Sequence, residues 1–538
     1  MRVLDLRAIV AIAAVLALTA CGDSMSPGGS DGKHPLAVLT PPIAAVAPFT
    51  HANFKASDDA GGTAAVTFRV NGIPGGSPVV GTITSNGEYT VPDSIPEGDT
   101  VVVTAVSVND TTQRKSSTVF FMPSLHEPES DYYVHFPRAL DLASPSTLRL
   151  FIFPAANVST ITFIHDGALT PLTNVGNRVF MLEISPTLAL SGFVAGSLHG
   201  LIGQLDYRAA DGSRVKLTGI GVNVRDANMA SVTLTQLAPD AQRSPFVLNL
   251  RYNGPYFRSA LPNVILARVR QLLGDRFDFV ALVSNVNSNN NRYFSHVRND
   301  VQGIGLGQFD NELGGRGRLR GFVTFPLDEY FDPGSAISHE VGHDWINFAT
   351  DPALHIGSPH WPMSSIASES VMGFSIGGAG GEGGMFPFSL ETLGNGNVRV
   401  HSRTPSTIYG SWDLYLMGLL PSDSVPPALV LPPTLPLSSL VPGFETPATT
   451  YTIAQYVAAH GARVPAYGSS PTEFTIATVV LSYGRLLSAS EMAYFDAAAS
   501  RIESTTAFQV TTGFATAATS SPFFVATGGR ARLHARLD

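Results

Sequence analysis

The sequence is poor in cysteine and in charged residues. Cys21 is the only cysteine among 538 residues, so a disulfide within the chain is excluded. Charged residues make up 14% of the chain and the net charge is −9, with no basic stripe. After residue 20, no stretch approaches the ~20 apolar residues of a membrane-spanning helix. The composition therefore excludes a disulfide scaffold and gives no sign of a nucleic-acid partner.

The first 21 residues have the pattern of a secretory signal. Arg2 and Arg7 precede an apolar run over 8–20, which is too short for a comfortable membrane span. The run ends in Leu-Thr-Ala-Cys at 18–21, which resembles the lipobox of bacterial lipoproteins. This resemblance implies a lipoprotein signal peptide over 1–20, a lipidated Cys21, and a flexible tether over 21–38. We therefore expect a protein of the bacterial cell envelope, lipid-anchored to a membrane and facing the periplasm or the cell surface.

The next 200 residues are typical of β-structure. The 51 glycines and 38 prolines of the chain indicate many short strands and turns. Residues 39–124 alternate apolar and polar side chains, and the segments 70–72 (VNG) and 86–89 (NGEY) resemble the immunoglobulin-like modules of bacterial surface proteins. Residues 125–240 continue as a second β-rich domain, either a prodomain or an extension of the spacer. Neither segment shows a pattern of catalytic residues.

The pattern changes near residue 245. Leu261, Ile265 and Val269 recur at helical spacing, and strand-like runs follow at 277–286 and 318–327 before another helix. This order matches the upper half of a zincin catalytic domain. We therefore expect a multidomain fold: all-β at the N-terminus, an α+β zincin-like domain over 241–425, and a small mixed α/β subdomain over 426–538.

Residues 338–345, SHEVGHDW, contain the pattern that suggests chemistry. Histidines four residues apart lie on one face of a helix, so His339 and His343 can bind one metal ion. Glu340 lies next to the first histidine and can reach a water on that metal without binding it. Zinc with two such histidines and a glutamate is the arrangement of metal-dependent peptidases, in which the carboxylate takes a proton from the water.

A catalytic zinc also needs a third protein ligand and one open position. Ala349 stands six residues after His343, where the metzincin pattern requires histidine, so that family is excluded. Four candidates remain: His360, His355, Glu369 and Asp413.

A wider resemblance favours one of them. The motif, the His-Trp pair at 360–361, the Gly-rich stretch at 372–386 and DLYLMGLLP at 413–421 together look like a group of predicted secreted bacterial metallopeptidases. The resemblance covers roughly residues 245–425. It implies that His360 is the third ligand, and Asp413 would then orient a ligand histidine. By residue type, Tyr409 and His401 are the candidates for stabilising an oxyanion.

Two functions follow as expectations. The first is a lipid-anchored zinc metallopeptidase that hydrolyses peptide bonds of a protein or peptide substrate, with Glu340 as general base. The alternative is a cell-surface binding or adhesion lipoprotein with a structural or degenerate metal site. Neither function implies a nucleic acid or an obligate protein partner.

Overall fold

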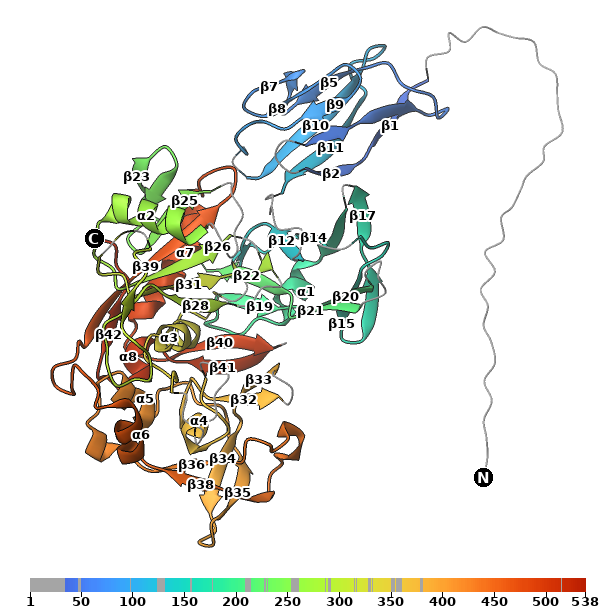
Figure 1. The fold of residues 1–538 in the computed structure, drawn as a ribbon. Coiled ribbons are helices and arrows are strands. Elements are labelled where there is room, and N and C mark those ends of the chain that lie inside the picture. The colour runs from blue at the N-terminus through green and yellow to red at the C-terminus, as the bar shows by residue number, and fades with distance from the viewer. Residues whose placement is uncertain are drawn as a thin grey trace, which may run out of the picture.

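The structure is a computed structural model that shows a multidomain, mostly β protein with a later mixed α/β region (Figure 1). It describes residues 34–46, 50–96, 98–122, 131–154, 157–176, 178–208, 214–226, 229, 231–252, 261–285, 287–288, 292–313, 315, 317–327, 330, 332–349, 354, 360–377, 381–513 and 515–538. The expected signal peptide, the lipidation site Cys21 and the candidate ligand His355 lie outside these residues.

The first region is a β-sandwich, drawn in blue in Figure 1, whose strand pairs are antiparallel except for the parallel pair β2 and β11. One sheet has the order β2 (Ile43–Val46), β11 (Arg114–Phe121), β10 (Thr100–Ser107), β5 (Val66–Val70), β6 (Ile73–Pro74). The facing sheet has the order β3 (His51–Asn53), β9 (Glu88–Thr90), β8 (Gly81–Ile83), β7 (Gly76–Ser77). In β10, Val101 and Val103 are buried while Val102 is 40% exposed. This alternation is the period of two that the sequence predicted.

The second region packs against the first through aromatic side chains. Its largest sheet has the order β17 (Thr173–Gly176), β18 (Val179–Ile184), β14 (Leu148–Phe153), β12 (Tyr132–Phe136), β27 (Asn287–Ser288). Phe120 of the first region lies 5.2 Å from Phe136 and 4.8 Å from Phe151, measured between ring centroids. These rings form a shared apolar cluster, so the two β-regions are joined by a packed interface as well as by the chain.

The third region is built on an eight-membered sheet. Its order is β23 (Thr235–Ala238), β24 (Ala241–Arg243), β25 (Val247–Arg251), β39 (Glu473–Ser482), β26 (Phe279–Ser284), β31 (Gly321–Phe325), β28 (Tyr293–His296), and β42 (Arg532–His534) pairs with β39. Every residue of β26 is buried, as expected for a parallel strand covered on both faces. Helix α2 (Leu261–Leu273) covers one face through Ile265 and Val269, and α3 (Ser335–Gly342) covers the other through Ile337 and Val341.

Residues 241–425 and 426–538 share this sheet, although the sequence indicated a division between them. Strand β39 lies between β25 and β26 and is parallel to both. Residues 474–481 therefore lie in the middle of this sheet and do not belong to a separate C-terminal subdomain. Helix α8 (Phe523–Ala526) contacts α3 from the same C-terminal segment.

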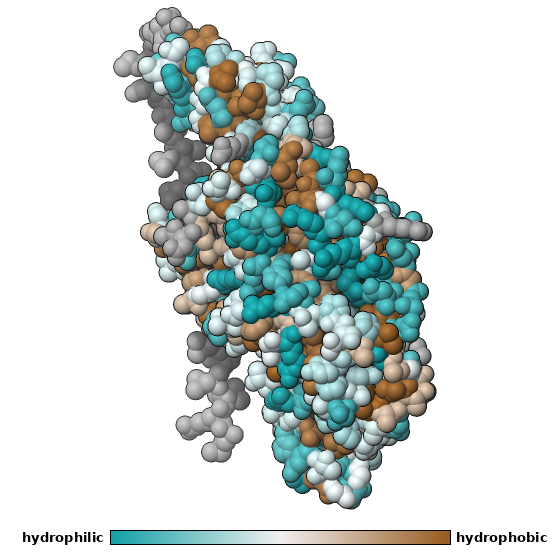
Figure 2. Space-filling view, turned by 90° about the vertical axis from the view of Figure 1, so that its left-hand side faces the viewer, coloured by the Kyte–Doolittle hydropathy of each residue, from teal (hydrophilic) through white to brown (hydrophobic). Residues whose placement is uncertain are grey.

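The surface and the helices add two observations. The face in Figure 2 is mainly hydrophilic across its middle, and hydrophobic residues occur there in scattered groups. Among the described residues, no helix combines the length and the apolar character that crossing a bilayer requires.

Candidate metal centre

Helix α3 presents the motif, and its start is fixed by a half-buried carboxylate. Asp332 Oδ1 accepts hydrogen bonds from the backbone N–H groups of Gly334 (3.1 Å) and Ser335 (2.9 Å). Ser520 also donates to this carboxylate, which ties the helix start to the C-terminal segment. The helix therefore begins at Ser335 and places His339 and Glu340 on its second turn.

Three imidazoles meet at the end of this helix. The ligand atoms of His339, His343 and His360 all lie within 4.8 Å of one another, and all three residues are buried. His339 Nε2 and His360 Nε2 are 3.0 Å apart. The ring of His343 is 5.0 Å from that of His339 and 4.8 Å from that of His360, between centroids. The structure thus brings together the two histidines of the motif and the favoured third candidate.

Two of these imidazoles, those of His339 and His343, are in the neutral state that binds a metal. Burial, together with the nearby Arg292 cation and the neighbouring histidines, lowers the pKa values of His339 and His343 well below 6.5. Both rings are therefore neutral at pH 7 and carry a lone pair. The Nδ1 of His339 faces the carbonyl oxygen of Val371 at 2.8 Å, which directs its Nε2 toward the other rings.

The backbone of His360 is held from two sides. The side-chain amide of Asn347 donates to the carbonyl oxygen of His360. On the other side, the backbone N–H of Trp361 donates to Met372 O at 3.0 Å, and its indole N–H donates to Asp413 Oδ1. Asp413 is fully buried, and burial raises its pKa to about 6. The carboxylate therefore positions the residue after His360, and it is not a member of the three-residue cluster.

Glu340 is held by an arginine that the sequence did not single out. Arg292 Nε donates to Glu340 Oε1 at 2.8 Å, and the side chains are 28% and 5% exposed. Arg292 follows the Asn-rich segment after β26, where no motif marks it. The carboxylate is thus fixed beside the histidines by a charge-assisted hydrogen bond.

The remaining candidates have other partners. The hydroxyl of Tyr409 donates its hydrogen bond to the carbonyl oxygen of Ser338 in α3. Its role as an oxyanion stabiliser stays a prediction. His401 is exposed on β35 (Asn397–Ser402), with Nε2 2.8 Å from Glu391 Oε2. Glu369 is exposed at the end of α4 (Ser365–Glu369) and is not in the cluster.

Sequence reasoning also missed an ion pair that anchors the end of the motif. Arg320 Nε donates to Asp344 Oδ2 at 2.6 Å, and Asp344, directly after His343, is fully buried. Arg320 also bonds to Asp300 at 2.7 Å. No local pattern could show this pair, because its members are 24 residues apart in sequence.

The donor set fits a zinc ion. Two nitrogens bound tetrahedrally at ~2.0–2.1 Å from zinc lie ~3.3 Å apart, close to the 3.0 Å between His339 and His360. The Nδ1 of His343 is buried and has no hydrogen-bond partner among the described residues. Within the described part of the chain, the cluster contains three donors and no fourth, which is the composition of a site with an open position.

Comparisons with known proteins do not assign the chain. No family model matches it, and no curated protein does. Among solved structures, it is similar to a Bacteroides ovatus mixed-linkage glucan utilization locus protein, SGBP-B (15% identity, 39% of this chain, 47% of that chain, TM-score 0.12). It is also similar to the surface layer protein SbsC (13% identity, 47% of this chain, 37% of that chain, TM-score 0.14). A third similar structure is the Ig1-2 module of the Drosophila receptor protein tyrosine phosphatase DLAR (14% identity, 36% of this chain, 100% of that chain, TM-score 0.14).

These similarities are weak. The chain spans about half or less of the first two structures. TM-scores of 0.12–0.14 support no conclusion about fold or function, so the site is interpreted from its own geometry.

Proposed function

We propose that the protein is a zinc-dependent metallopeptidase of the HExxH type, with a zincin-like domain around the sheet, α2 and α3. The observation that carries this proposal is the convergence of three buried imidazoles, those of His339, His343 and His360, beside Glu340 of α3. Chance could place HExxH in a sequence, but it does not explain a third histidine, 17 residues beyond His343, whose ligand atom lies within 4.8 Å of those of the other two.

The residues have separate roles in this proposal. His339, His343 and His360 would hold the zinc ion. When bound, zinc lowers the pKa of a water molecule to ~7 and polarises a carbonyl group. Glu340 would serve as the general base and then as the general acid toward the leaving amine. Arg292 orients the carboxylate, while Asn347 and Trp361 fix His360.

The substrate class and the location extend this proposal. A protein or peptide substrate suits an activated water beside a general base, because amide hydrolysis needs both the nucleophile and a protonated leaving group. The N-terminal pattern supports lipid attachment at Cys21 and a place in the bacterial cell envelope, with the β-regions separating the site from the membrane.

The alternative is a surface-binding lipoprotein in which the metal is structural. Structural zinc sites usually fill all four positions with protein ligands. The described residues supply three, and a carboxylate is held beside them, so the arrangement favours catalysis.

The test replaces the proposed general base, Glu340, and keeps the three histidines that would bind the metal. Glu340→Gln is expected to retain one zinc ion per chain and to lose peptide cleavage by at least ~10²-fold. Metal analysis measures the first quantity, and new termini in a mixed peptide library, detected by mass spectrometry, measure the second. Glu445→Gln, on an exposed glutamate, is the matched control and should change neither. A wild-type protein that binds zinc but leaves the library intact would favour the surface-binding alternative.

A further inference from the structure

A second site lies where all three regions of the chain meet. A cavity of about 320 Å³ is bounded by Asp99 of the first sandwich, residues 133–139 and Arg225 of the second region, and Leu327 and Glu491 of the third. None of the three metal-centre histidines lines it. Cavities of ~300–1,000 Å³ at domain junctions are where proteins usually bind small molecules.

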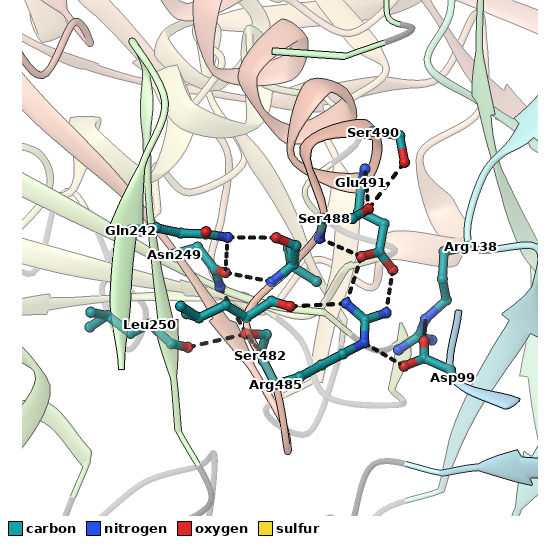
Figure 3. Close-up of polar contacts among 12 residues, drawn as sticks. Asp99, Arg138, Gln242, Asn249, Leu250, Ser482, Arg485, Ser488, Ser490 and Glu491 are labelled. Carbon is teal, nitrogen blue, oxygen red and sulfur yellow. Dashed lines mark hydrogen bonds and ion pairs between the residues drawn. The ribbon is translucent and has the colours of Figure 1, made fainter. Parts of the chain in front are cut away.

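The acidic groups of the cavity are already paired. Figure 3 shows Arg485 between Asp99 and Glu491. Its Nε donates to Asp99 Oδ1 at 2.9 Å, and its two terminal nitrogens each lie 2.7 Å from an oxygen of Glu491. Glu491 also accepts the backbone N–H of Ser488 at 2.8 Å, as part of the capping box of α7 (Ala489–Ser500). The two carboxylates are therefore fixed by one guanidinium and a helix start.

Two further guanidinium groups are left with weak partners. Arg138 Nε is 3.5 Å from Asp99 Oδ2, and Figure 3 shows its guanidinium beside that carboxylate. A terminal nitrogen of Arg225 is 3.8 Å from Asp141, whose side chain is 38% exposed. The Nε of Arg225 is shielded from solvent and has no hydrogen-bond partner among the described residues.

The charged groups around the cavity balance one another, but two of the guanidinium groups keep donors for a ligand. Arg138, Arg225 and Arg485 are matched by the carboxylates of Asp99, Asp141 and Glu491, and of these three arginines only Arg485 donates side-chain hydrogen bonds among the described residues. His135, also in the wall, adds no charge at pH 7, because burial lowers its pKa to about 4. A carboxylate carries one charge and two oxygens that match a guanidinium, whereas a phosphate monoester carries nearly two charges.

The rest of the wall is apolar or aromatic. Phe136, Leu327, Leu487 and Phe495 line the cavity beside the rings of Tyr133 and Tyr494. The hydroxyl of Tyr133 accepts the N–H of Gly221 at 2.9 Å, and that of Tyr494 donates to Asn223 at 3.1 Å. With both hydroxyls engaged, these tyrosines offer their ring faces to a ligand.

We propose that this cavity binds a small monocarboxylate with an apolar or aromatic body, whose carboxylate is recognised by the guanidinium groups of Arg138 and Arg225. Because the wall comes from all three regions, the bound ligand links them. This proposal is independent of the metal centre.

The test uses a matched pair of probes on the whole protein. Isothermal titration with 4-phenylbutanoate is expected to show saturable binding at one site, and the uncharged 4-phenylbutanamide should bind about tenfold more weakly or worse. Arg138→Met and Arg225→Met should each weaken binding of the acid about ten- to hundredfold and leave binding of the amide nearly unchanged. Arg225→Lys, which keeps the charge without the planar fork, should fall between.

The control is Arg399→Met, on an exposed arginine paired with Glu445 on another part of the surface. It should bind both probes like the wild type. Zinc content, measured in every variant, shows whether the fold around the metal centre has been preserved. Equal binding of acid and amide by the wild type, no binding of the acid, or wild-type affinity in both methionine variants would overturn the proposal.

Discussion

Two variants of Asn347 can separate the effect of its side-chain hydrogen bond to His360 from the effect of its strained backbone conformation. Its φ is +62°, in the left-handed region that costs an L-residue other than glycine, asparagine or aspartate ~1–2 kcal/mol. Its side-chain amide donates to the carbonyl oxygen of His360. Asn347→Ala loses both features, whereas Asn347→Gly keeps the backbone conformation and loses only the amide.

Zinc affinity and folding stability should therefore respond differently. Both variants free the backbone of His360, and the loss of such an outer contact typically weakens metal binding ~10–100-fold. Both also leave a buried carbonyl oxygen without its donor, which costs ~1–3 kcal/mol of stability. Asn347→Ala should lose about 1 kcal/mol more than Asn347→Gly, because only alanine is strained at this φ.

The assays are a zinc titration against a competing chelator and urea unfolding of the metal-free protein. Asn71 provides the control, since its φ is +48° and its Oδ1 accepts the N–H of Val102 at 2.8 Å in the first sandwich. Asn71→Ala should reduce stability without changing zinc affinity. Wild-type zinc affinity in both Asn347 variants would refute the idea that this amide positions His360.

Three further predictions concern contacts around the two sites. Arg292→Met should cost ~1.5–3 kcal/mol of stability in the wild type and much less in a Glu340→Gln background, because the charged partner is then gone. Gly342→Ala should cost ~1–3 kcal/mol, since its Cβ would lie 2.7 Å from Met372 Sδ, and Met372→Ala should recover part of that loss. His135, with its pKa lowered from 6.5 to about 4 by burial, binds a proton more readily when unfolded. Its contribution of about 3 kcal/mol is therefore present above pH ~6.5 and is lost as pH falls toward 4.

Each of these predictions has a measurement that can contradict it. Urea unfolding is measured for the wild type, Arg292→Met, Glu340→Gln and the double variant. If the pair did not interact, Arg292→Met would reduce the free energy of unfolding by the same amount in both backgrounds. A Gly342→Ala protein of wild-type stability would mean that Met372 moves aside without cost. For His135, the slope of unfolding free energy against pH between 4 and 6.5 should be smaller in His135→Gln, and an unchanged slope would assign the pH dependence to other groups.

The local elements were predictable because their signals are local. Helical spacing over 257–275 predicted α2, and apolar runs predicted β26 and β31 within a few residues. The place of β39 in the middle of the sheet was not predictable, because an apolar run indicates that a strand is buried but not which strands flank it. Its neighbours β25 and β26 precede it in sequence by about 190 to 230 residues, a separation that no periodicity encodes.

In the metal centre, too, the local pattern was predictable from the sequence and the long-range contacts were not. The spacing of His339, Glu340 and His343 is a property of one helix, so the sequence alone predicts it. The choice of His360 came from a resemblance, since the loop between it and the helix has no regular spacing. Arg292 was not predictable, because its contact with Glu340 spans 48 residues and depends on how the segment after β26 returns to the helix.

The C-terminal segment helps to build the metal centre as well as the sheet. Ser338, next to the first ligand, donates from its hydroxyl to Ser521 O at 3.0 Å, and the backbone N–H of Ser521 donates to Ser335 Oγ at 2.8 Å. Together with the bond from Ser520 to Asp332, these contacts fix α3 from residues more than 180 positions away. The histidine spacing is therefore local information, but the orientation of the helix that carries it depends on long-range contacts.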